Sequence, residues 1–288
     1  MITILFPSSY IQHHQVDPDL EDEAKIVAET PGLQLAVFDY EAWFRKKKFK
    51  LTLTPEEPIQ QALYRGWMMK PDAYKKFYES LSKMHIQLLT TPKEYSTLHL
   101  FPNAYPLIKE DTAPTMYFEP GEHVDVNKIT KEFQRFMVKD DVKAVKGSKF
   151  PSFFDQQITQ EEFDTYMNIF YKIRGEYLTG GLCVKEYLDL KTDERGRTNE
   201  YRAFFLKGEL LSLHPDSGQD FPDNQPPENL LKKYNSLPSP FYSLDLAEKK
   251  EGGWIVLETG DGQVSRLSPG QSPELFYVTL AKRLLEQE

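Results

Sequence analysis

Residues 241–261 read Phe241-Tyr-Ser-Leu-Asp-Leu-Ala-Glu-Lys-Lys-Glu-Gly-Gly-Trp-Ile-Val-Leu-Glu-Thr-Gly-Asp261, and this stretch decides the fold of the second half of the chain. Two apolar runs, 241–247 and 254–259, flank a polar segment that ends in two glycines. This pattern predicts a β-hairpin, whose two-residue turn we place at Glu251-Gly252. Together with a preceding hairpin, it indicates an α+β fold with antiparallel strands for this half.

The predicted hairpin brings two acidic residues together. Its register places Asp245 directly opposite Glu258 on one face, with Cβ atoms about 5 Å apart. Two carboxylates this close repel each other unless a cation lies between them, and magnesium typically takes one or two carboxylates and completes its shell with water and phosphates. We therefore predict a magnesium site at Asp245 and Glu258, with Asp261 as a third candidate ligand. Two solvent-facing carboxylates at strand ends fit the spacing equally well.

A basic segment lies upstream, between Lys131 and Lys149. It holds six basic and three acidic residues, a local net charge of +3 in a chain whose net charge is −9. Lysines that alternate with small residues, as from Lys139 through Lys143, are expected where a strand and a loop cover phosphate groups. By composition alone, a solvated charged face is the commoner explanation.

Charged residues also interrupt two predicted strands. Lys185 and Glu186 lie in the strand 182–188, and Arg202 lies in the strand 201–206. Because burying a lone guanidinium is costly, Arg202 requires an anionic partner, either a protein carboxylate such as Glu200 or a ligand phosphate. Lys185 has the simpler option of extending its amine to the edge of the sheet.

The composition excludes several classes of protein. The chain has 288 residues with 35 Lys and Arg against 44 Asp and Glu, and this acidic balance disfavours nucleic-acid binding. The single cysteine, Cys183, excludes an internal disulfide and fits a reducing compartment. No apolar run approaches the roughly 20 residues that span a bilayer. Neither a P-loop nor a Gly-x-Gly-x-x-Gly sequence occurs. We expect a soluble, cytoplasmic protein without a membrane partner.

The chain divides into two predicted domains at about residue 120. Residues 1–120 form a leading α/β domain, in which we expect turns from Pro92 to Pro120 and the following order of elements: strand 2–6, helix 19–29, strand 35–38, a helix opened by Pro71, and strand 86–89. Residues 121–288 form the second domain, which we expect to contain a strand at 136–139, a helix capped by Thr159 and Glu162, hairpins, a loop at 215–240, and a last helix after Ser272-Pro273. The apolar face of that last helix is compatible with internal packing or with a homodimer.

Taken in chain order, these segments resemble the ATP-grasp family. The resemblance rests on residues 136–143, 184–190, 200–205, 241–245 and 254–263, which match in order and spacing the lysine strand, hinge strand, arginine strand and paired metal carboxylates of that family. Asp39-Tyr-Glu-Ala42 and Tyr64-Arg-Gly-Trp-Met68 resemble the leading domain of a compact bacterial and phage clade. The resemblance covers nearly the whole chain and implies a two-lobed ATP-grasp fold behind a leading domain.

The resemblance also implies roles for the basic and hinge residues. Lys139 and Lys143 would contact the phosphates of ATP, and Lys185 would contact the adenine side or the α-phosphate. Glu186 and Tyr187 would form the hinge strand that binds adenine through the backbone.

The remaining implied roles concern catalysis, metal and acceptor. Arg202, with Lys143, would act in catalysis by stabilising charge on the transferred phosphate. Asp245 and Glu258 would hold magnesium, and Arg65 would bind the carboxylate of the acceptor. Many relatives have Glu-x-Asn in the last strand, whereas Glu258 is followed here by Thr-Gly-Asp261, so a second magnesium ion is not implied.

The function implied is an ATP- and magnesium-dependent carboxylate-amine ligase that acts through an acylphosphate on small-molecule or peptide substrates. Two alternatives remain open from the sequence. One is an ATP-binding module without ligase activity. The other is an RNA-directed enzyme that uses ATP, which the basic segment motivates although the net charge disfavours it.

Overall fold

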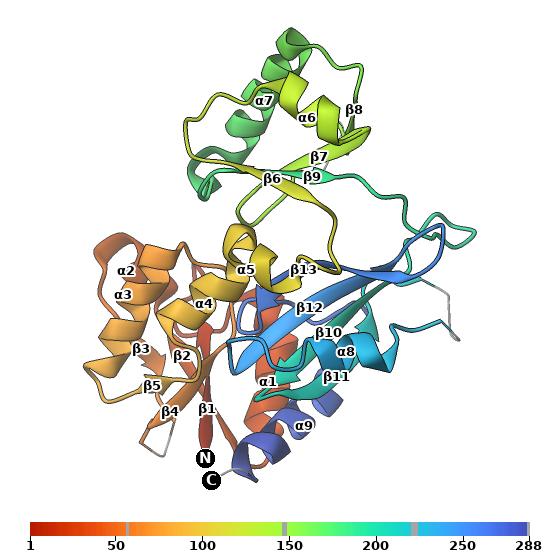
Figure 1. Ribbon diagram of the computed structural model, residues 1–288. Coiled ribbons are helices and arrows are strands. Elements are labelled where there is room, and N and C mark those ends of the chain that lie inside the picture. The colour runs from red at the N-terminus through yellow and green to blue at the C-terminus, as the bar shows by residue number, and fades with distance from the viewer. Residues whose placement is uncertain (56–57, 146–148, 220–223, 287–288) are drawn as a thin grey trace.

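The first sheet of the computed structural model, which describes residues 1–55, 58–145, 149–219 and 224–286, has five strands in the order β3-β2-β1-β4-β5 (Figure 1). Four strands are parallel and β3 is an antiparallel edge. The strands are β1 (Ile2–Pro7), β2 (Leu33–Phe38), β3 (Leu51–Leu53), β4 (Gln61–Tyr64) and β5 (Gln87–Leu88). The helical segments of this part are η1 (Pro18–Leu20), α1 (Glu21–Glu29), α2 (Tyr40–Lys46) and α3 (Pro71–Ser82). The expected strand-helix-strand pattern is confirmed.

The region 92–120 corrects the sequence prediction, because it holds two helices and a strand where turns were expected. They are α4 (Pro92–His99), α5 (Phe101–Ile108) and β6 (Thr115–Phe118). Thr91 and Glu94 form a reciprocal capping box at the start of α4, and Pro92 occupies its first turn, where its missing N–H costs nothing. The prolines of this region therefore mark helix starts rather than breaks, apart from Pro106 inside α5.

A small lobe is built on a second, antiparallel sheet with the order β6-β9-β7-β8. Its other strands are β7 (Arg135–Asp140), β8 (Phe154–Asp155) and β9 (Leu182–Glu186), and its helical segments are α6 (Val126–Glu132), α7 (Gln160–Arg174) and η2 (Gly175–Tyr177). Figure 1 shows this lobe standing apart from the rest of the chain. Since β6 precedes residue 120 and pairs with β9, the small lobe begins before that residue. The division into domains at 120 stays a proposal.

The large lobe is built on a third, antiparallel sheet with the order β11-β10-β12-β13. Its elements are β10 (Glu200–Leu206), β11 (Glu209–Pro215), α8 (Glu228–Lys233), β12 (Phe241–Glu248), β13 (Trp254–Asp261) and α9 (Pro273–Leu285). Helix α8 lies within the predicted loop 215–240, of which residues 220–223 are outside the described part. Helices α4 and α5 pack against β13. The α+β fold class expected for this half is confirmed.

The hairpin of β12 and β13 pairs as predicted at its functional position, but by a different route. Near the tip, Glu248 pairs with Trp254 and Leu246 with Val256, so the turn is not the two-residue turn that we expected. The register then shifts between Leu246 and Asp245, and Asp245 pairs with Glu258. The shift leaves Leu257 as an extra, unpaired residue on β13, which is a β-bulge.

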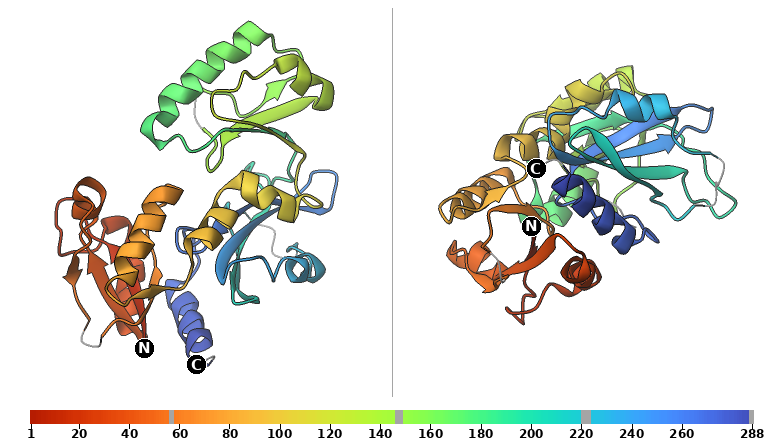
Figure 2. Two further views of the ribbon diagram at one scale, coloured as in Figure 1. Left: turned by 60° about the vertical axis from the view of Figure 1, so that its left-hand side comes forward. Right: turned by 90° about the horizontal axis from the view of Figure 1, so that it is seen from below.

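The leading sheet and the large lobe share one apolar core. Ile4 and Phe6 of β1 pack in the same cluster as Phe204 of β10 and Phe276 and Leu280 of α9. Figure 2 shows α9 lying between these two parts of the chain. The small lobe has a core of its own, formed from its strands and from α6 and α7. The packing therefore defines one large body and one smaller body.

Helix α9 uses most of its apolar face inside the chain, since Phe276, Leu280 and Leu284 are buried. Leu275 is 69% exposed, and a homodimer through this helix stays a prediction. No helix among the described residues is both long enough and apolar enough to cross a membrane.

The capping box of α7 provides a test of how the small lobe is stabilised. The Thr159 hydroxyl accepts a hydrogen bond from the Glu162 amide, and the Glu162 carboxylate accepts one from the Thr159 amide. We expect Thr159→Ala to lower the free energy of unfolding by about 1 kcal/mol, because the cap at the start of the helix is lost. Urea unfolding followed by circular dichroism measures this. Thr165→Ala, at an exposed position inside the same helix, is the control, and an equal loss in both variants would contradict the capping role.

Candidate active site

A cavity of about 200 Å³ opens where the small lobe, the large lobe and the leading part meet. Its lining comes from five short segments that are distant in sequence: 65–68, 99–101, 139–143, 258–260 and 264–266. Arg202, Ser243 and Asp245 complete the wall on the side of the large lobe. Most of the predicted site residues therefore meet at one place.

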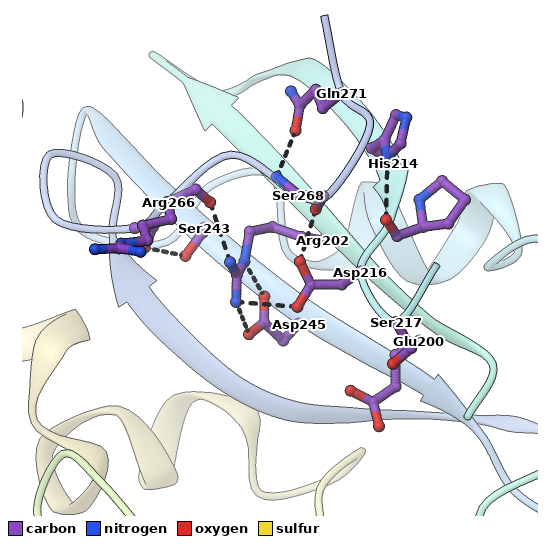
Figure 3. Close-up of polar contacts among 12 residues, drawn as sticks. Glu200, Arg202, His214, Asp216, Ser217, Ser243, Asp245, Arg266, Ser268 and Gln271 are labelled. Atoms are coloured by element: carbon purple, nitrogen blue, oxygen red, sulfur yellow. Dashed lines mark hydrogen bonds and ion pairs between the residues drawn. The ribbon is translucent and has the colours of Figure 1, made fainter. Parts of the chain in front are cut away.

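Arg202 and Asp245 form a bidentate ion pair at the cavity wall. They are direct cross-strand neighbours on β10 and β12, and Nε and Nη2 of Arg202 lie 2.8 and 2.7 Å from the two carboxylate oxygens of Asp245. Figure 3 shows the guanidinium held also by Asp216 and by the backbone oxygen of Arg266. The anionic partner that Arg202 requires is thus Asp245. Glu200, the partner considered from the sequence, instead accepts a hydrogen bond from Thr198.

Glu258 is held by a lysine of the opposite lobe. Nζ of Lys139, on β7, lies 2.7 Å from Oε2 of Glu258, and the Lys139 side chain is almost completely buried. The Glu258 side chain is 38% exposed, toward the cavity. Burial opposes the charged form of Glu258, but Lys139, helped by Lys143 and Lys185, lowers its pKa to about 2. Glu258 is therefore ionised at neutral pH.

The two carboxylates are adjacent but electrostatically different. Burial raises the pKa of Asp245, against the opposing effect of Arg202, and the charge of Glu258 raises it further. Each carboxylate has one cation of its own, Arg202 for Asp245 and Lys139 for Glu258. The predicted repulsion between them is thus relieved within the chain, by charges that come from both lobes.

Lys185 lies beside this array and depends on the bulge in β13. Its Nζ donates a hydrogen bond of 2.6 Å to the backbone oxygen of Leu257, the extra residue of the bulge. The amines of Lys185 and Lys139 both approach the ring of Phe101, at 4.7 and 4.9 Å from its centroid. Burial, with the nearby charge of Lys139, lowers the pKa of Lys185 to about 7. Lys185 itself does not line the cavity.

Lys143 is the cation that the described residues leave without an ion-pair partner at the cavity wall. Its backbone amide and that of Val142 donate to Oδ1 of Asp140, which is completely buried. The other oxygen of Asp140 accepts hydrogen bonds from Arg174 and from the Thr179 amide. The backbone that carries Lys143 is therefore held rigidly, while its exposed side chain is available. Lys146, in the same basic segment, lies outside the described residues.

Two further predicted residues, Glu186 and Tyr187, lie outside the cavity at the end of β9. The Glu186 amide donates to the backbone oxygen of Pro114, and the Tyr187 amide donates to that of Arg135. The Tyr187 ring stacks on Phe153, with centroids 4.4 Å apart. Their role as an adenine-binding hinge stays a prediction.

Asp261 is not brought to the cavity. It is completely buried, and its Oδ1 accepts hydrogen bonds from the amide and the side chain of Gln263. Burial raises its pKa to about 7. The described residues contain no group of three or more Asp, Glu, His or Cys side chains arranged to hold a metal ion. The candidate metal ligands at the cavity are therefore Asp245 and Glu258.

Arg65 lines the cavity, yet its guanidinium is bound within the chain. It is 2% exposed and pairs with Glu23 of α1 at 2.9 Å. It also donates to Tyr277 of α9 and to the backbone oxygens of Gly262 and Ser265. The carboxylate of an acceptor could reach this guanidinium only by displacing Glu23. Arg65 thus connects the leading part to the loop that follows β13.

His99 and Phe101 are cavity residues that the sequence reasoning missed. Both lie in the segment that was interpreted as turns, where α4 ends and α5 begins. Burial and the charge of Lys143 lower the pKa of His99 to about 4, so its ring is neutral at neutral pH. The capping signature Thr91-Pro-Lys-Glu94 was the signal that would have found α4 and therefore His99.

The overall architecture is that of ATP-grasp proteins of known structure. An ATP-grasp RimK domain protein from Sphaerobacter thermophilus is similar with a TM-score of 0.62 at 11% identity, covering 99% of this chain and 100% of that one. D-alanyl-alanine synthetase A from Vibrio cholerae gives 0.60 at 12% identity over 100% and 98% of the two chains. The ATP-grasp ligase PsnB, complexed with minimal precursor, Mg and ADP, gives 0.58 at 8% identity over 99% and 97%.

Sequence comparison assigns the family within this fold. Residues 126–283 match a family described as an ATP-grasp domain, the third family of its clade. The chain therefore belongs to this family of ATP-grasp proteins, as the sequence motifs indicated. No curated protein matches the chain in sequence.

The neutral, buried His99 makes the stability depend on pH. Between its ordinary pKa of about 6.5 and its lowered value, the unfolded chain binds a proton that the folded chain does not, so stability falls as the pH falls. We expect His99 to account for a loss of about 2 kcal/mol between about pH 7 and pH 5. In His99→Gln this component disappears, and urea unfolding at the two pH values measures the difference. The exposed His123→Gln is the control, and unchanged pH dependence in His99→Gln would refute the assignment.

The Arg65–Glu23 pair predicts a large effect on stability. Glu23→Gln leaves a buried guanidinium without its counter-charge, so we expect the free energy of unfolding to fall by about 3 kcal/mol. Denaturant unfolding measures it. Glu29→Gln, at an exposed position of the same helix, should change stability by less than about 0.5 kcal/mol. Equal stability of the two variants would show that the pair does not join the two parts of the chain.

Proposed function

We propose that this chain is an ATP- and magnesium-dependent ligase, which joins a carboxylate to an amine through an acylphosphate. The observation that carries the proposal is the charge array at the cavity. Two adjacent carboxylates, Asp245 and Glu258, alternate there with Arg202 and Lys139, and the unpaired Lys143 faces the same space. A triphosphate with its magnesium needs both signs of charge on facing elements.

The donor set at the cavity fits magnesium. Asp245 and Glu258 offer the hard carboxylate oxygens that this ion prefers, and Glu258 is partly exposed toward the cavity. Lys139 takes one oxygen of Glu258 and leaves the other without a hydrogen bond among the described residues. When bound there, magnesium would neutralise the charge on the phosphates.

The chain's own cations account for phosphate binding. Lys143, on its rigid backbone and with a free amine, would contact the phosphates together with Lys139. Arg202 is fixed in place by Asp245, Asp216 and the backbone oxygen of Arg266. A guanidinium held in advance can stabilise charge that develops on the transferred phosphate without reorganising.

The proposed chemistry consists of two balanced steps. An oxygen of the substrate carboxylate attacks the terminal phosphorus of ATP, the bond to the bridging oxygen breaks, and ADP leaves with the electron pair. The amine nitrogen then attacks the acyl carbon, inorganic phosphate leaves, and the nitrogen loses a proton. A D-alanyl-alanine synthetase and a peptide-precursor ligase among the similar structures support this class of reaction. Small-molecule or peptide carboxylates and amines are therefore the proposed substrates.

The metal carboxylates provide the test. We expect Asp245→Asn and Glu258→Gln each to reduce ADP formation at least about 100-fold, measured with ATP, magnesium and a mixture of carboxylates and amines. Arg202→Ala should have a similar effect, because the transferred phosphate loses its fixed positive charge. Glu228→Gln, an exposed carboxylate of α8, is the control, and circular dichroism shows whether each variant is folded. Turnover equal to the unmodified chain in Asp245→Asn and Glu258→Gln would refute the proposal.

The two alternatives predict different outcomes. An ATP-binding module would be stabilised by ATP and magnesium in a thermal-shift titration without forming ADP from any mixture. An RNA-directed enzyme would bind RNA with a steep dependence on salt. The structure offers little for the RNA alternative, because Lys139 of the basic segment is buried against Glu258 and Arg135 pairs with Asp189.

A further inference from the structure

A second cavity of about 370 Å³ adjoins the first one, between the leading part and the small lobe. Tyr40, Trp67 and Met68 line it from the leading part, and Arg174 and Tyr177 line it from the end of α7 and the turn beyond. The two cavities share Lys143, His99 and Trp67 in their walls. A ligand in the second cavity would therefore lie directly beside the phosphate-binding cation of the first.

The charged residues of the second cavity are all positive. They are Lys70, Lys143 and Arg174, and no acidic residue lies among the described residues that line it. Neither Lys70 nor Lys143 forms an ion pair with the described part of the chain, whereas Arg174 is partly engaged by Asp140 and by the backbone oxygen of Tyr177. In a chain with a net charge of −9, this local excess of positive charge favours an anionic ligand.

The rest of the lining is aromatic or apolar. Tyr40 and Trp67 are half-buried, Met68 is 40% exposed, and Tyr177 is 70% exposed. Large apolar side chains with this much exposed surface, gathered around one opening, mark a binding surface. The volume lies at the lower end of the range for small-molecule sites, so the cavity suits a ligand of amino-acid size and not a folded domain.

We propose that the second cavity binds the carboxylate substrate, and that this substrate is a small monocarboxylate carrying an aromatic or long apolar group. The inference rests on the proposed ligase function, because the carboxylate must lie next to the terminal phosphate, and Lys143 is where the two cavities meet. Lys143 receives the carboxylate, Tyr40 and Tyr177 contact the apolar group, and Lys70 adds attraction for the negative charge.

Four small probes separate the contributions of charge and apolar surface. We would titrate the full chain calorimetrically with 3-phenylpropionate, 3-phenylpropanol, propionate and succinate, with and without magnesium and a non-hydrolysable ATP analogue. The analogue occupies the phosphate cavity, so binding that persists in its presence reports on the second cavity. We expect 3-phenylpropionate to bind at least about tenfold more tightly than each of the others, since only this probe carries both recognised features. Equal binding of 3-phenylpropionate and 3-phenylpropanol, or tighter binding of succinate, would overturn the proposal.

Two surface variants then locate the site. Lys70→Ala should weaken binding of 3-phenylpropionate about threefold, because an exposed charge contributes little more than this. Tyr177→Ser should weaken it about fivefold while leaving the binding of propionate unchanged, because only the aromatic contact is lost. Lys75→Ala, at an exposed position of the helix that follows Lys70, is the matched control. Both site variants should bind the ATP analogue normally.

The outcomes distinguish this inference from the proposed function. If ADP formation depends on Asp245 and Glu258 but 3-phenylpropionate does not bind in any condition, the cavity assignment is wrong and the ligase proposal stands. If 3-phenylpropionate binds and responds to Lys70→Ala and Tyr177→Ser but no carboxylate yields ADP, the cavity binds an aromatic carboxylate and the ligase proposal fails.

Discussion

The buried guanidinium of Arg65 is the constraint on which the arrangement of the large body depends. A buried cation without partners is costly, so the elements that supply its acceptors must keep their positions. These acceptors come from α1, from α9 and from the loop after β13. The same loop carries the backbone oxygen of Arg266 to Arg202. One buried charge in the leading part therefore fixes a hydrogen bond to the guanidinium that faces the cavity.

The small lobe is attached in a different way. It has its own apolar core, and its contacts with the large body near the cavity are polar. Lys139 pairs with Glu258, Lys185 donates to Leu257, and the Phe101 amide donates to the backbone oxygen of Asp141. Apolar contacts hold the large body together, whereas charge and hydrogen bonds position the small lobe over it. The ligand cavities lie where these two kinds of packing meet.

Sequence reasoning succeeded where a local pattern determines the outcome. Alternating apolar residues located β12 and β13, and their pairing brought Asp245 opposite Glu258, although the turn was predicted wrongly. It was less successful where residues distant in sequence decide the role of a side chain. The Arg65 guanidinium faces Glu23 and Tyr277, and the sequence contains no signal for that proximity. The helices after Thr91 were missed because prolines were interpreted as breaks, although proline in a first turn favours a helix.

The bulge at Leu257 separates the hairpin into two segments with independent registers. The segment near Asp261 sets the pairing of Asp245 with Glu258, and the bulge absorbs the offset between that segment and the tip. The loop at the tip can therefore differ in length between related chains without turning the functional carboxylates to the other face of the sheet. An alignment that forces the tips of such hairpins to match would misplace Glu258 by one residue, and it would also assign the wrong residue to the backbone oxygen that Lys185 binds.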